Sequence, residues 1–205
     1  MRQILKKLEK AKSCGIAETI SSRINEFRRA GKKESMLFGE LCFCLLTANF
    51  NAERSIKIQE EIGDGFLEYG EKKLASELKR LGHRFPNMRA RFIFEARKHK
   101  DKLREVLSKP EHEAREWLVN NVKGLGWKEA SHFLRNVGFN DSAIIDFHIV
   151  DLLVENNVIE RPKALTKNKY LEIEALLKEI ASKSDLDLAE LDLYLWCMET
   201  GKILK

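Results

Sequence analysis

Hydrophobic residues recur at steps of three and four positions along most of the chain. In the first thirty residues they occupy Ile4, Leu5, Leu8, Ile16, Ile20, Ile24 and Phe27. This spacing puts the apolar side chains on one face of a helix and predicts one or two amphipathic helices over residues 3–30. The same pattern, punctuated by Pro and Gly, predicts further helices over residues 34–46, 52–62, 71–81, 86–100, 110–121, 127–136, 147–156, 169–182 and 186–200.

No segment shows sustained alternation of apolar and polar residues, the pattern of a half-buried strand. Only three prolines and eleven glycines interrupt the chain, which favours long helices over many short strands. The sequence therefore predicts an all-α protein of about ten helices. Its 205 residues suffice for one large domain or for two small lobes that share a core.

Composition excludes several classes of protein. Hydrophobic residues make up 43% and charged residues 34% of the chain, which is typical of a globular protein and not of a disordered one. No apolar run approaches the ~20 residues that span a bilayer. The first residues, MRQILKKLEKAK, lack a continuous apolar segment, so we expect no signal peptide and a cytoplasmic location.

The four cysteines indicate neither a metal site nor disulfides. They stand at positions 14, 42, 44 and 197, without a CxxC pair. This spacing fits neither a zinc site nor an iron–sulfur cluster. We expect free thiols in a reducing compartment.

The net charge of +5 is unevenly distributed. Residues 79–100 hold eight Lys or Arg and one acid, whereas residues 184–200 hold five acids and no base. A locally basic stretch in a nearly neutral chain suggests one face that binds a polyanion. A solvated helix face is an equally good interpretation on charge alone.

The most informative segment runs from Trp117 to Asp151. The short sequence Val122–Gly126 (VKGLG) separates two predicted helices. Its two glycines permit positive φ and close approach to another surface. The helix that follows directs unpaired N–H groups outward, which makes its start a candidate site for a DNA phosphate. A tight helix connection with a Gly cap is the alternative.

Two residues in this segment can carry chemistry. Lys128 stands in the first turn of the second helix, and Asp146 directly precedes the next one. A lysine amine can attack an electrophilic carbon, and a carboxylate can stabilise positive charge or accept a proton. The alternatives are a solvent-facing lysine and an ordinary N-cap aspartate.

Here the sequence resembles a known family. VKGLGWKEASHF followed by AIIDFHIVDLL is similar to the helix-hairpin-helix plus aspartate motif of DNA base-excision glycosylases. ELCFCLLTANFNAERSI resembles the region before the lesion-facing loop of 8-oxoguanine glycosylases. The C-terminal ELDLYLWCMETGKILK resembles the small microbial type 2 branch of these enzymes. The resemblance covers nearly the whole chain.

The resemblance implies an all-α fold of two helical lobes with an active-site cleft between them. We expect residues 1–205 to form one unit. Lobe A would comprise roughly residues 1–51 plus 154–205, and lobe B roughly residues 52–153, with the hairpin at 122–127.

The resemblance also implies a bifunctional DNA glycosylase/AP lyase that acts on 8-oxoguanine in duplex DNA. Lys128 would be the nucleophile, forming a Schiff base at C1′, and Asp146 its catalytic partner. β-Elimination would then nick the strand 3′ to the lesion. The target base must leave the helix to reach Lys128.

Three residues are candidates for base recognition. By resemblance, Trp196 would stack on the flipped base, and His132, one helical turn after Lys128, would line the other side. The terminal carboxylate of Lys205 would accept the N7–H that distinguishes 8-oxoguanine from guanine. The alternatives are a core tryptophan and a frayed tail.

A further set of residues would contact DNA around the flipped base. The asparagines before the predicted helix 52–62 would fill the gap left by the base, and Phe85 would insert into the stack. Arg54 and Arg84 would lie near the unpaired partner base, and the hairpin and His148 would contact phosphate. Turn chemistry explains the asparagines equally well, and core packing explains Phe85. The set comprises Asn49, Asn51, Arg54, Arg84, Phe85, Lys123, Gly124, Gly126 and His148.

We expect no required cofactor. An iron–sulfur cluster like that of some relatives needs four closely spaced C-terminal cysteines, and only Cys197 lies there. The backbone carbonyls of Lys123 and Gly126 are candidate ligands for a cation beside a DNA phosphate. The expected partner is duplex DNA containing 8-oxoguanine, in the nucleoid, bound by a monomer that does not contact membranes.

Three other interpretations stay open. The same mechanism could act on another oxidised base, such as a pyrimidine. The chain could be a helix-hairpin-helix module that only binds DNA, although binding alone requires neither Lys128 nor Asp146. It could also be a helical scaffold without salt-dependent DNA affinity.

Overall fold

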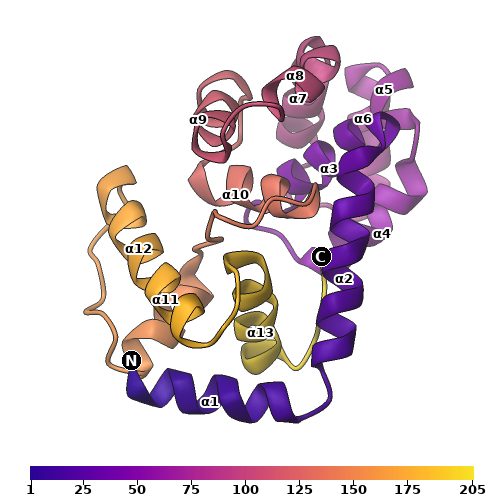
Figure 1. Cartoon of the computed structure of the whole chain (residues 1–205). Helices are drawn as coiled ribbons and strands as arrows, with labels where there is room; N and C mark the ends of the chain where they lie inside the picture. The colour runs from indigo at the N-terminus through magenta and orange to yellow at the C-terminus, as the bar shows by residue number, and fades with distance from the viewer.

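The structure, a computed structural model, describes all 205 residues. The chain forms thirteen α-helices and one 3-10 helix and contains no strand, which confirms the predicted all-α class (Figure 1). The elements are α1 (Arg2–Ser13), α2 (Ala17–Lys32), α3 (Glu34–Thr47), α4 (Ala52–Ile62), α5 (Gly65–Glu68), α6 (Glu71–Arg80), α7 (Pro86–Ala96), η1 (Arg97–Lys102), α8 (Leu103–Val106), α9 (Glu111–Asn121), α10 (Trp127–Asn136), α11 (Phe147–Glu155), α12 (Lys167–Lys183) and α13 (Leu188–Thr200).

Most helix boundaries follow their sequence signals, with one clear exception. Pro86 occupies the first position of α7, and Gly201 ends α13 with a left-handed φ of 72°. The predicted helix 86–100, however, is α-helical only to Ala96 and continues as the 3-10 helix η1. No residue of η1 is buried, so no packed face holds this segment in α geometry.

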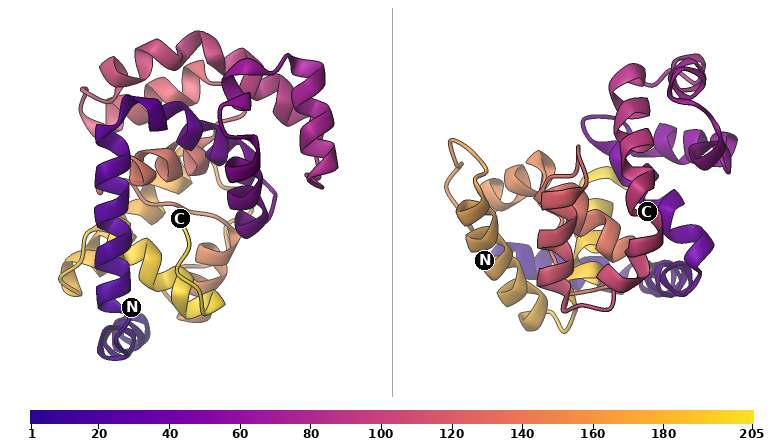
Figure 2. Two further views of the ribbon diagram at one scale, coloured as in Figure 1. Left: turned by 90° about the vertical axis from the view of Figure 1, so that its right-hand side faces the viewer. Right: turned by 90° about the horizontal axis from the view of Figure 1, so that it is seen from above.

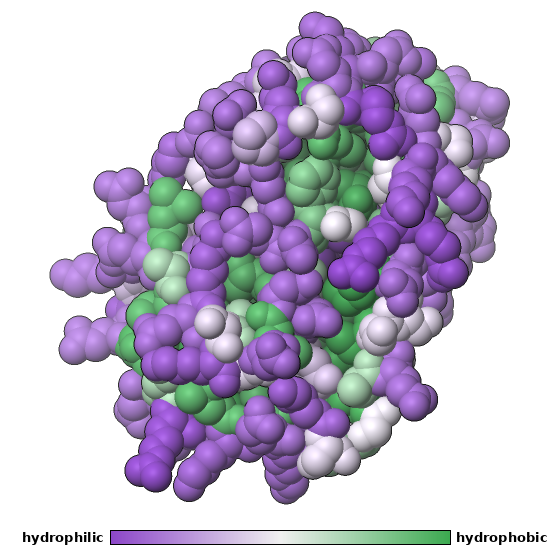
Figure 3. All heavy atoms as spheres, in the orientation of Figure 1, coloured by the Kyte–Doolittle hydropathy of each residue, from purple (hydrophilic) through white to green (hydrophobic).

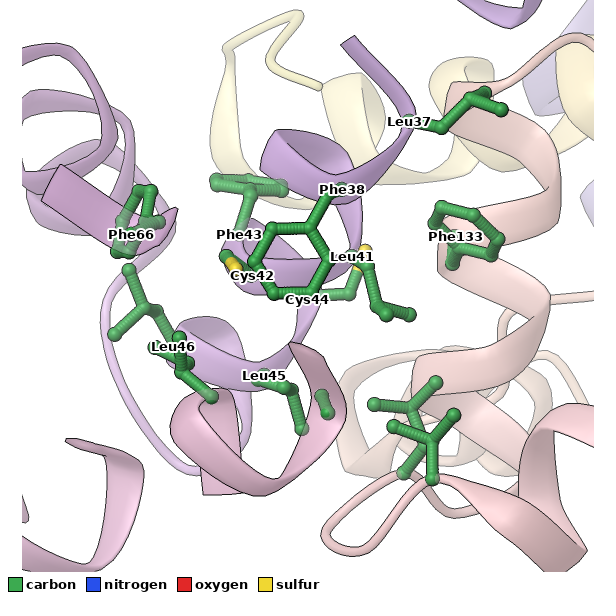
Figure 4. Close-up of a cluster of buried hydrophobic side chains, with 14 of the residues drawn as sticks. Leu37, Phe38, Leu41, Cys42, Phe43, Cys44, Leu45, Leu46, Phe66 and Phe133 are labelled. Atoms are coloured by element: carbon green, nitrogen blue, oxygen red, sulfur yellow. The ribbon is translucent and has the colours of Figure 1, made fainter. Parts of the chain in front are cut away.

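Two hydrophobic cores organise the helices. The first core contains 26 buried residues between Leu37 and Val137, and α3 forms its centre. Figure 4 shows Phe38, Leu41 and Phe43 of α3 beside Phe66 and Phe133. The second core contains 22 buried residues from α1, α2, α11, α12 and α13, together with Ala143 and Ile145.

The cores divide the chain at other points than the predicted lobe boundaries. Helix α3 was predicted in lobe A, but its buried residues Leu37–Leu46 belong to the first core with α4–α10. Helix α11 was predicted in lobe B, but Ile149–Leu153 pack in the second core. Periodicity shows which face of a helix is buried, but not against which neighbour it packs.

The two cores lie one above the other in Figure 1. Helices α5–α9 occupy the upper part, α1, α11 and α13 the lower part, and α10 lies between them. The turned views of Figure 2 place the C-terminus near the middle of the molecule, between the two parts. Figure 3 shows hydrophilic residues over most of one face, with hydrophobic atoms visible mainly in the recesses. None of the helices has the length and apolar character required of a membrane span.

A buried polar network joins the two cores near α12. Arg115 of α9 forms a bidentate ion pair with Glu174 of α12, and both side chains are more than 90% buried. The same carboxylate accepts a hydrogen bond from the N–H of Ala143 at 2.8 Å. The Tyr170 hydroxyl donates to the Ala143 carbonyl at 2.7 Å and accepts from the N–H of Ile145 at 3.1 Å. Helix α12 thereby fixes the segment that leads into α11.

We predict that Glu174→Leu lowers the free energy of unfolding by about 3–5 kcal/mol, because it leaves the buried Arg115 guanidinium without a counter-charge. Urea denaturation measures this change. Glu116→Gln is the matched control, since the Glu116–Lys167 pair also joins α9 to α12 but is about half exposed. The control should cost under about 1 kcal/mol, and equal losses in the two variants would contradict the assigned role of the buried pair.

Candidate active site

A cavity of about 780 Å³ opens between the two cores. Its walls come from the residues after α3, from α10, from the segment before α11, from α13 and from the last residues of the chain. Lys128, Asp146, His132, Trp196 and Lys205 all line it. The structure therefore brings both predicted catalytic residues and all three predicted base-recognition residues into one cavity, of a volume typical of ligand sites.

The hairpin places Lys128 at the cavity. Gly124 adopts φ +91°, and a Cβ there would lie 2.3 Å from the Phe92 ring, so this position requires glycine. Gly126 is the N-cap of α10 with φ −92° and does not use the left-handed region. Lys128 is the second residue of α10 and is half-buried.

The predicted anion site at the start of α10 is partly occupied by the protein itself. The Glu129 carboxylate accepts a hydrogen bond from the N–H of Gly126 at 3.2 Å. A carboxylate at this position pairs one of the N–H groups that the helix leaves unpaired, and its negative charge interacts favourably with the positive end of the helix dipole. A DNA phosphate would have to share these donors with Glu129.

Asp146 serves as the N-cap of α11. Its Oδ1 accepts a hydrogen bond from the N–H of Ile149 at 3.1 Å, so the structural interpretation of this residue is confirmed. The carboxylate is only half-buried and lines the cavity. The cap fixes the orientation of the side chain and leaves Oδ2 without a partner in the hydrogen bonds of the fold, which is compatible with a second, chemical role.

His132 and Trp196 have polar groups that the folded protein leaves unpaired. The indole Nε1 of Trp196 is buried without a hydrogen-bond partner, and neither ring nitrogen of His132, which is 6% exposed, makes a hydrogen bond of ordinary geometry, although the Lys205 backbone approaches the ring. Burial, with the charges of Arg135 and Lys128, holds the pKa of His132 well below its ordinary value, so the ring is neutral. Unpaired buried donors and acceptors are unfavourable, and a bound ligand can pair them.

His148 connects Trp196 to the exposed rim of the cavity. Its ring stands edge-on to Trp196, with centroids 5.5 Å apart, and stacks on Phe147 at 4.0 Å. Phe147 is 66% exposed although it is apolar. No motif in the sequence points to Phe147; its position directly after Asp146 is the only available signal.

The residues around the start of α4 do not all face the cavity. Asn49, with a left-handed φ of 58°, and Asn51 line it. Asn51 also caps α4 by accepting a hydrogen bond from the Arg54 N–H at 3.0 Å, so it has the local structural role that was the alternative to DNA contact. The Arg54 guanidinium donates to the Gly82 carbonyl at 3.1 Å. The cavity is also lined by Phe50, which the sequence analysis did not single out.

The predicted wedge, Phe85, lies beside a residue that lines the cavity. Phe85 is the N-cap residue of α7 and is half-buried, with the Arg84 guanidinium 4.9 Å from its ring centre. Arg84 lines the cavity and Phe85 does not. The insertion role of this pair stays a prediction.

Part of the basic stretch has a structural role. Arg89 is 3% exposed and donates to the carbonyl of Ala48. The Arg97 guanidinium donates to the carbonyls of Phe66 and Tyr69. These two charges hold backbone segments. Of the other basic residues of the stretch, Arg80, Arg91 and Lys100 already form exposed ion pairs with acidic side chains, so a polyanion would compete with those acids.

A largely buried carboxylate of the cavity, Asp192, carries no signal in the sequence. Asp192 of α13 accepts from Arg135 of α10 at 2.9 Å, and both side chains are largely buried. Burial raises the pKa of Asp192 to about 6; Arg135 opposes this rise and the Asp146 carboxylate adds to it. Asp192 stands in the acidic C-terminal segment. It is 57 positions from Arg135, so no local sequence pattern predicts that the two side chains form an ion pair.

No group of three His, Cys, Asp or Glu side chains converges to hold a metal ion. Cys14 is exposed, Cys42 and Cys44 are buried, and Cys197 is half-buried, all with free thiols. At the hairpin, the Gly126 carbonyl already accepts from the N–H of Ala130 at 2.9 Å, which leaves one lone pair for a cation. The proposed carbonyl site at Lys123 and Gly126 stays a prediction.

Comparison with known proteins agrees with this geometry. The family model for 8-oxoguanine DNA glycosylase matches residues 20–186. An 8-oxoguanine DNA glycosylase/AP lyase of Korarchaeum cryptofilum is 52% identical over 95% of this chain and 94% of its own length. A protein of the same description from Methanocaldococcus jannaschii is 52% identical over 98% of this chain and 99% of its length.

Solved structures give the same result. The crystal structure of the Methanocaldococcus jannaschii 8-oxoguanine glycosylase/lyase with a 15mer DNA containing 8-oxoguanine superposes with a TM-score of 0.96 at 52% identity, covering 99% of this chain and 100% of that one. The 8-oxoguanine DNA glycosylase of Thermotoga maritima gives 0.95 at 43% identity, covering both chains completely. A cleft that brings a hairpin lysine and a capping aspartate together, in a fold shared over the full length with these proteins, places this chain in the helix-hairpin-helix family of 8-oxoguanine DNA glycosylases.

Proposed function

We propose that this protein is a bifunctional DNA glycosylase and AP lyase that removes 8-oxoguanine from duplex DNA. The observation that carries the proposal is the presence of Lys128 and Asp146 in one cavity large enough for a nucleobase. The relatives' substrate, named in their descriptions, supports 8-oxoguanine as the target. A module that only binds DNA would need neither residue in the cavity.

The proposed reaction begins with the amine of Lys128. Its neutral Nζ attacks C1′ of the flipped nucleotide, and the C1′–N9 bond breaks as the base leaves with the bonding electrons and takes up a proton. Positive charge develops on the sugar during this step, and the nearby Asp146 carboxylate stabilises it. The Asp146 carboxylate would also accept a proton from Lys128, either before attack to free the amine or afterwards from the nitrogen bonded to C1′.

The lyase step follows from the bond to Lys128. Opening of the sugar ring gives an imine between Nζ and C1′, which acidifies the protons on C2′. Loss of a C2′ proton to a base expels the 3′ phosphate with its bonding electrons, so the strand breaks on the 3′ side. Removal of the base by an activated water would leave no such imine, so the lysine is the residue that supplies strand cleavage.

Base recognition would use the groups that the fold leaves unpaired. The Trp196 indole N–H and the neutral His132 ring offer a donor and a donor–acceptor pair to a flipped base. The edge-on His148 and the exposed Phe147 form an apolar rim where sugar or base surface can pack. Arg84 and Asn49, which also line the cavity, would contact the DNA that the base has left.

We predict that Lys128→Gln abolishes covalent trapping by borohydride on a duplex with one 8-oxoguanine, lowering adduct yield at least about 100-fold, because no imine can form. Salt-dependent binding of the duplex should persist. Lys178→Gln, an exposed lysine paired with Asp141, is the control and should trap like wild type. An adduct only on duplexes with an oxidised pyrimidine would move the substrate to another base. No adduct on any duplex, with binding intact, would overturn the lysine mechanism and leave a monofunctional glycosylase or a protein that only binds DNA.

We predict that Asp146→Asn separates the two roles of this residue. Asparagine caps a helix as well as aspartate does, so the free energy of unfolding should change by less than about 1 kcal/mol. Single-turnover excision should fall roughly 100- to 1,000-fold, because the amide carries no negative charge for the developing cation. Loss of stability in parallel with activity would show that Asp146 acts only as a cap.

We predict a pH-dependent stability difference between wild type and Asp192→Asn. The pKa of Asp192 is raised to about 6 from an ordinary value of 3.8, so between these values the folded protein retains a proton that the unfolded chain releases. The contribution of Asp192 to the free energy of unfolding therefore decreases as pH rises from about 4 to 6 and is constant above that range. Denaturation of both proteins across this range measures it, and parallel curves would refute the raised pKa.

A further inference from the structure

The last residues of the chain cross from the second core to the first. After α13 ends, Ile203 packs against the second core, whereas the Lys205 side chain reaches α3 and α4 of the first core. The Lys205 ammonium donates to the Glu40 carboxylate at 2.7 Å and to the Gln59 side-chain oxygen. It also lies 4.6 Å from the centre of the Phe43 ring. We call Glu40, Phe43 and Gln59 the lysine socket.

The lysine socket is itself held rigidly. The Glu40 carboxylate accepts from Gln59 Nε2 at 3.2 Å and from Asn136 Nδ2 at 3.1 Å. Gln59 Nε2 also donates to the Gly39 carbonyl at 2.9 Å. The lysine socket therefore joins α3, α4 and, through Asn136, α10. Because Glu40 and Gln59 are held by these hydrogen bonds, they cannot shift with Lys205 without breaking them.

The ion pair is largely buried although Lys205 belongs to an irregular segment. The Lys205 side chain is 18% exposed and the Glu40 side chain 6%, while residues 202–205 form no helix that would hold them in place. Apolar side chains of similar volume would give equal or greater stability at such a position. Unlike an apolar contact, the ion pair between Lys205 and Glu40 is directional, so it fixes the position of the residues that follow α13.

The lysine socket adjoins the base pocket. The Phe43 ring, over which the Lys205 ammonium lies, meets the His132 ring edge-on, with centroids 5.5 Å apart and planes at 80°. Lys205 and its neighbour Leu204 line the same cavity as His132 and Trp196. A shift of the ammonium would move both the tail and the packing of His132.

We propose that Glu40 and Gln59 are positioning residues for base recognition: by fixing the Lys205 ammonium, they hold the tail against His132 as one wall of the base pocket. They act through Lys205 and do not touch the reacting atoms. This inference rests on the proposed function, because it concerns the selection of the base and leaves the Lys128 chemistry in place.

The test compares two reactions of the full chain. Glu40→Gln should lower single-turnover excision of 8-oxoguanine from duplex DNA roughly 10- to 100-fold, because a misplaced pocket wall disturbs the reacting geometry. Cleavage at a preformed abasic site, which needs no base recognition, should stay within about 3-fold of wild type. A merely structural role would lower both reactions alike.

The chain offers a matched control. Glu53 pairs with Lys202 of the same tail at the same distance of 2.7 Å, but both side chains are about half exposed. Glu53→Gln should leave the ratio of 8-oxoguanine excision to abasic-site cleavage unchanged, since an exposed pair fixes little. An equal fall of this ratio in the two variants would overturn the specific role of the lysine socket.

A double variant tests whether Glu40 acts through Lys205. If it does, Glu40→Gln combined with Lys205→Met should excise 8-oxoguanine no more slowly than the slower single variant. Multiplied effects would overturn the proposal. Should Glu40→Gln fail to fold, as shown by thermal unfolding, Gln59→Met makes the same comparison without changing charge.

The outcomes separate this inference from the proposed function. Wild type that cleaves abasic sites but does not excise 8-oxoguanine would overturn the proposed substrate, and the lysine socket with it. Wild type that excises 8-oxoguanine, with Glu40→Gln and Gln59→Met equally active, would overturn the socket alone.

Discussion

The buried carboxylate of Glu174 is the constraint on which the geometry of the cavity depends. It binds Arg115 of α9, the helix that runs into the hairpin, and also accepts the N–H of Ala143, three residues before Asp146. One charged group therefore sets the distance between the hairpin that carries Lys128 and the segment that carries Asp146. Removing two charges from water is costly unless further hydrogen bonds support them; here the Ala143 N–H and the Ser131 hydroxyl supply such bonds, although the Arg115 Nε keeps no partner.

Both residues proposed to be catalytic stand at helix N-termini. Lys128 is in the first turn of α10 and Asp146 caps α11, so each backbone is held by helix hydrogen bonds while each side chain stays half-buried at the cavity. The ion pair between Arg135 and Asp192 adds one cation and one carboxylate to the same space. The cavity thus combines charges of both signs in a partly desolvated setting, where electrostatic effects on a developing sugar cation are stronger than in water.

The cavity is incomplete as a set of hydrogen bonds. The rings of His132 and Trp196 keep buried nitrogens without partners, while neighbouring polar groups in the lysine socket are fully paired. Unpaired groups lower stability, and they lie where a flipped base would supply donors and acceptors. The groups around the pocket are held by hydrogen bonds, whereas polar atoms within it lack partners. This arrangement suits a site that selects one base from others of similar shape.

The sequence by itself determined the helical class, most helix boundaries, the hairpin and the two residues that carry the proposed chemistry. These features are local: apolar spacing, caps and glycine positions act over a few residues. The tertiary structure decided that α3 joins the first core and α11 the second, that Arg135 pairs with Asp192, and that Lys205 reaches Glu40 across 165 positions. No local pattern encodes such pairs, because they depend on which helix faces the folding chain brings together and on how much water that packing excludes.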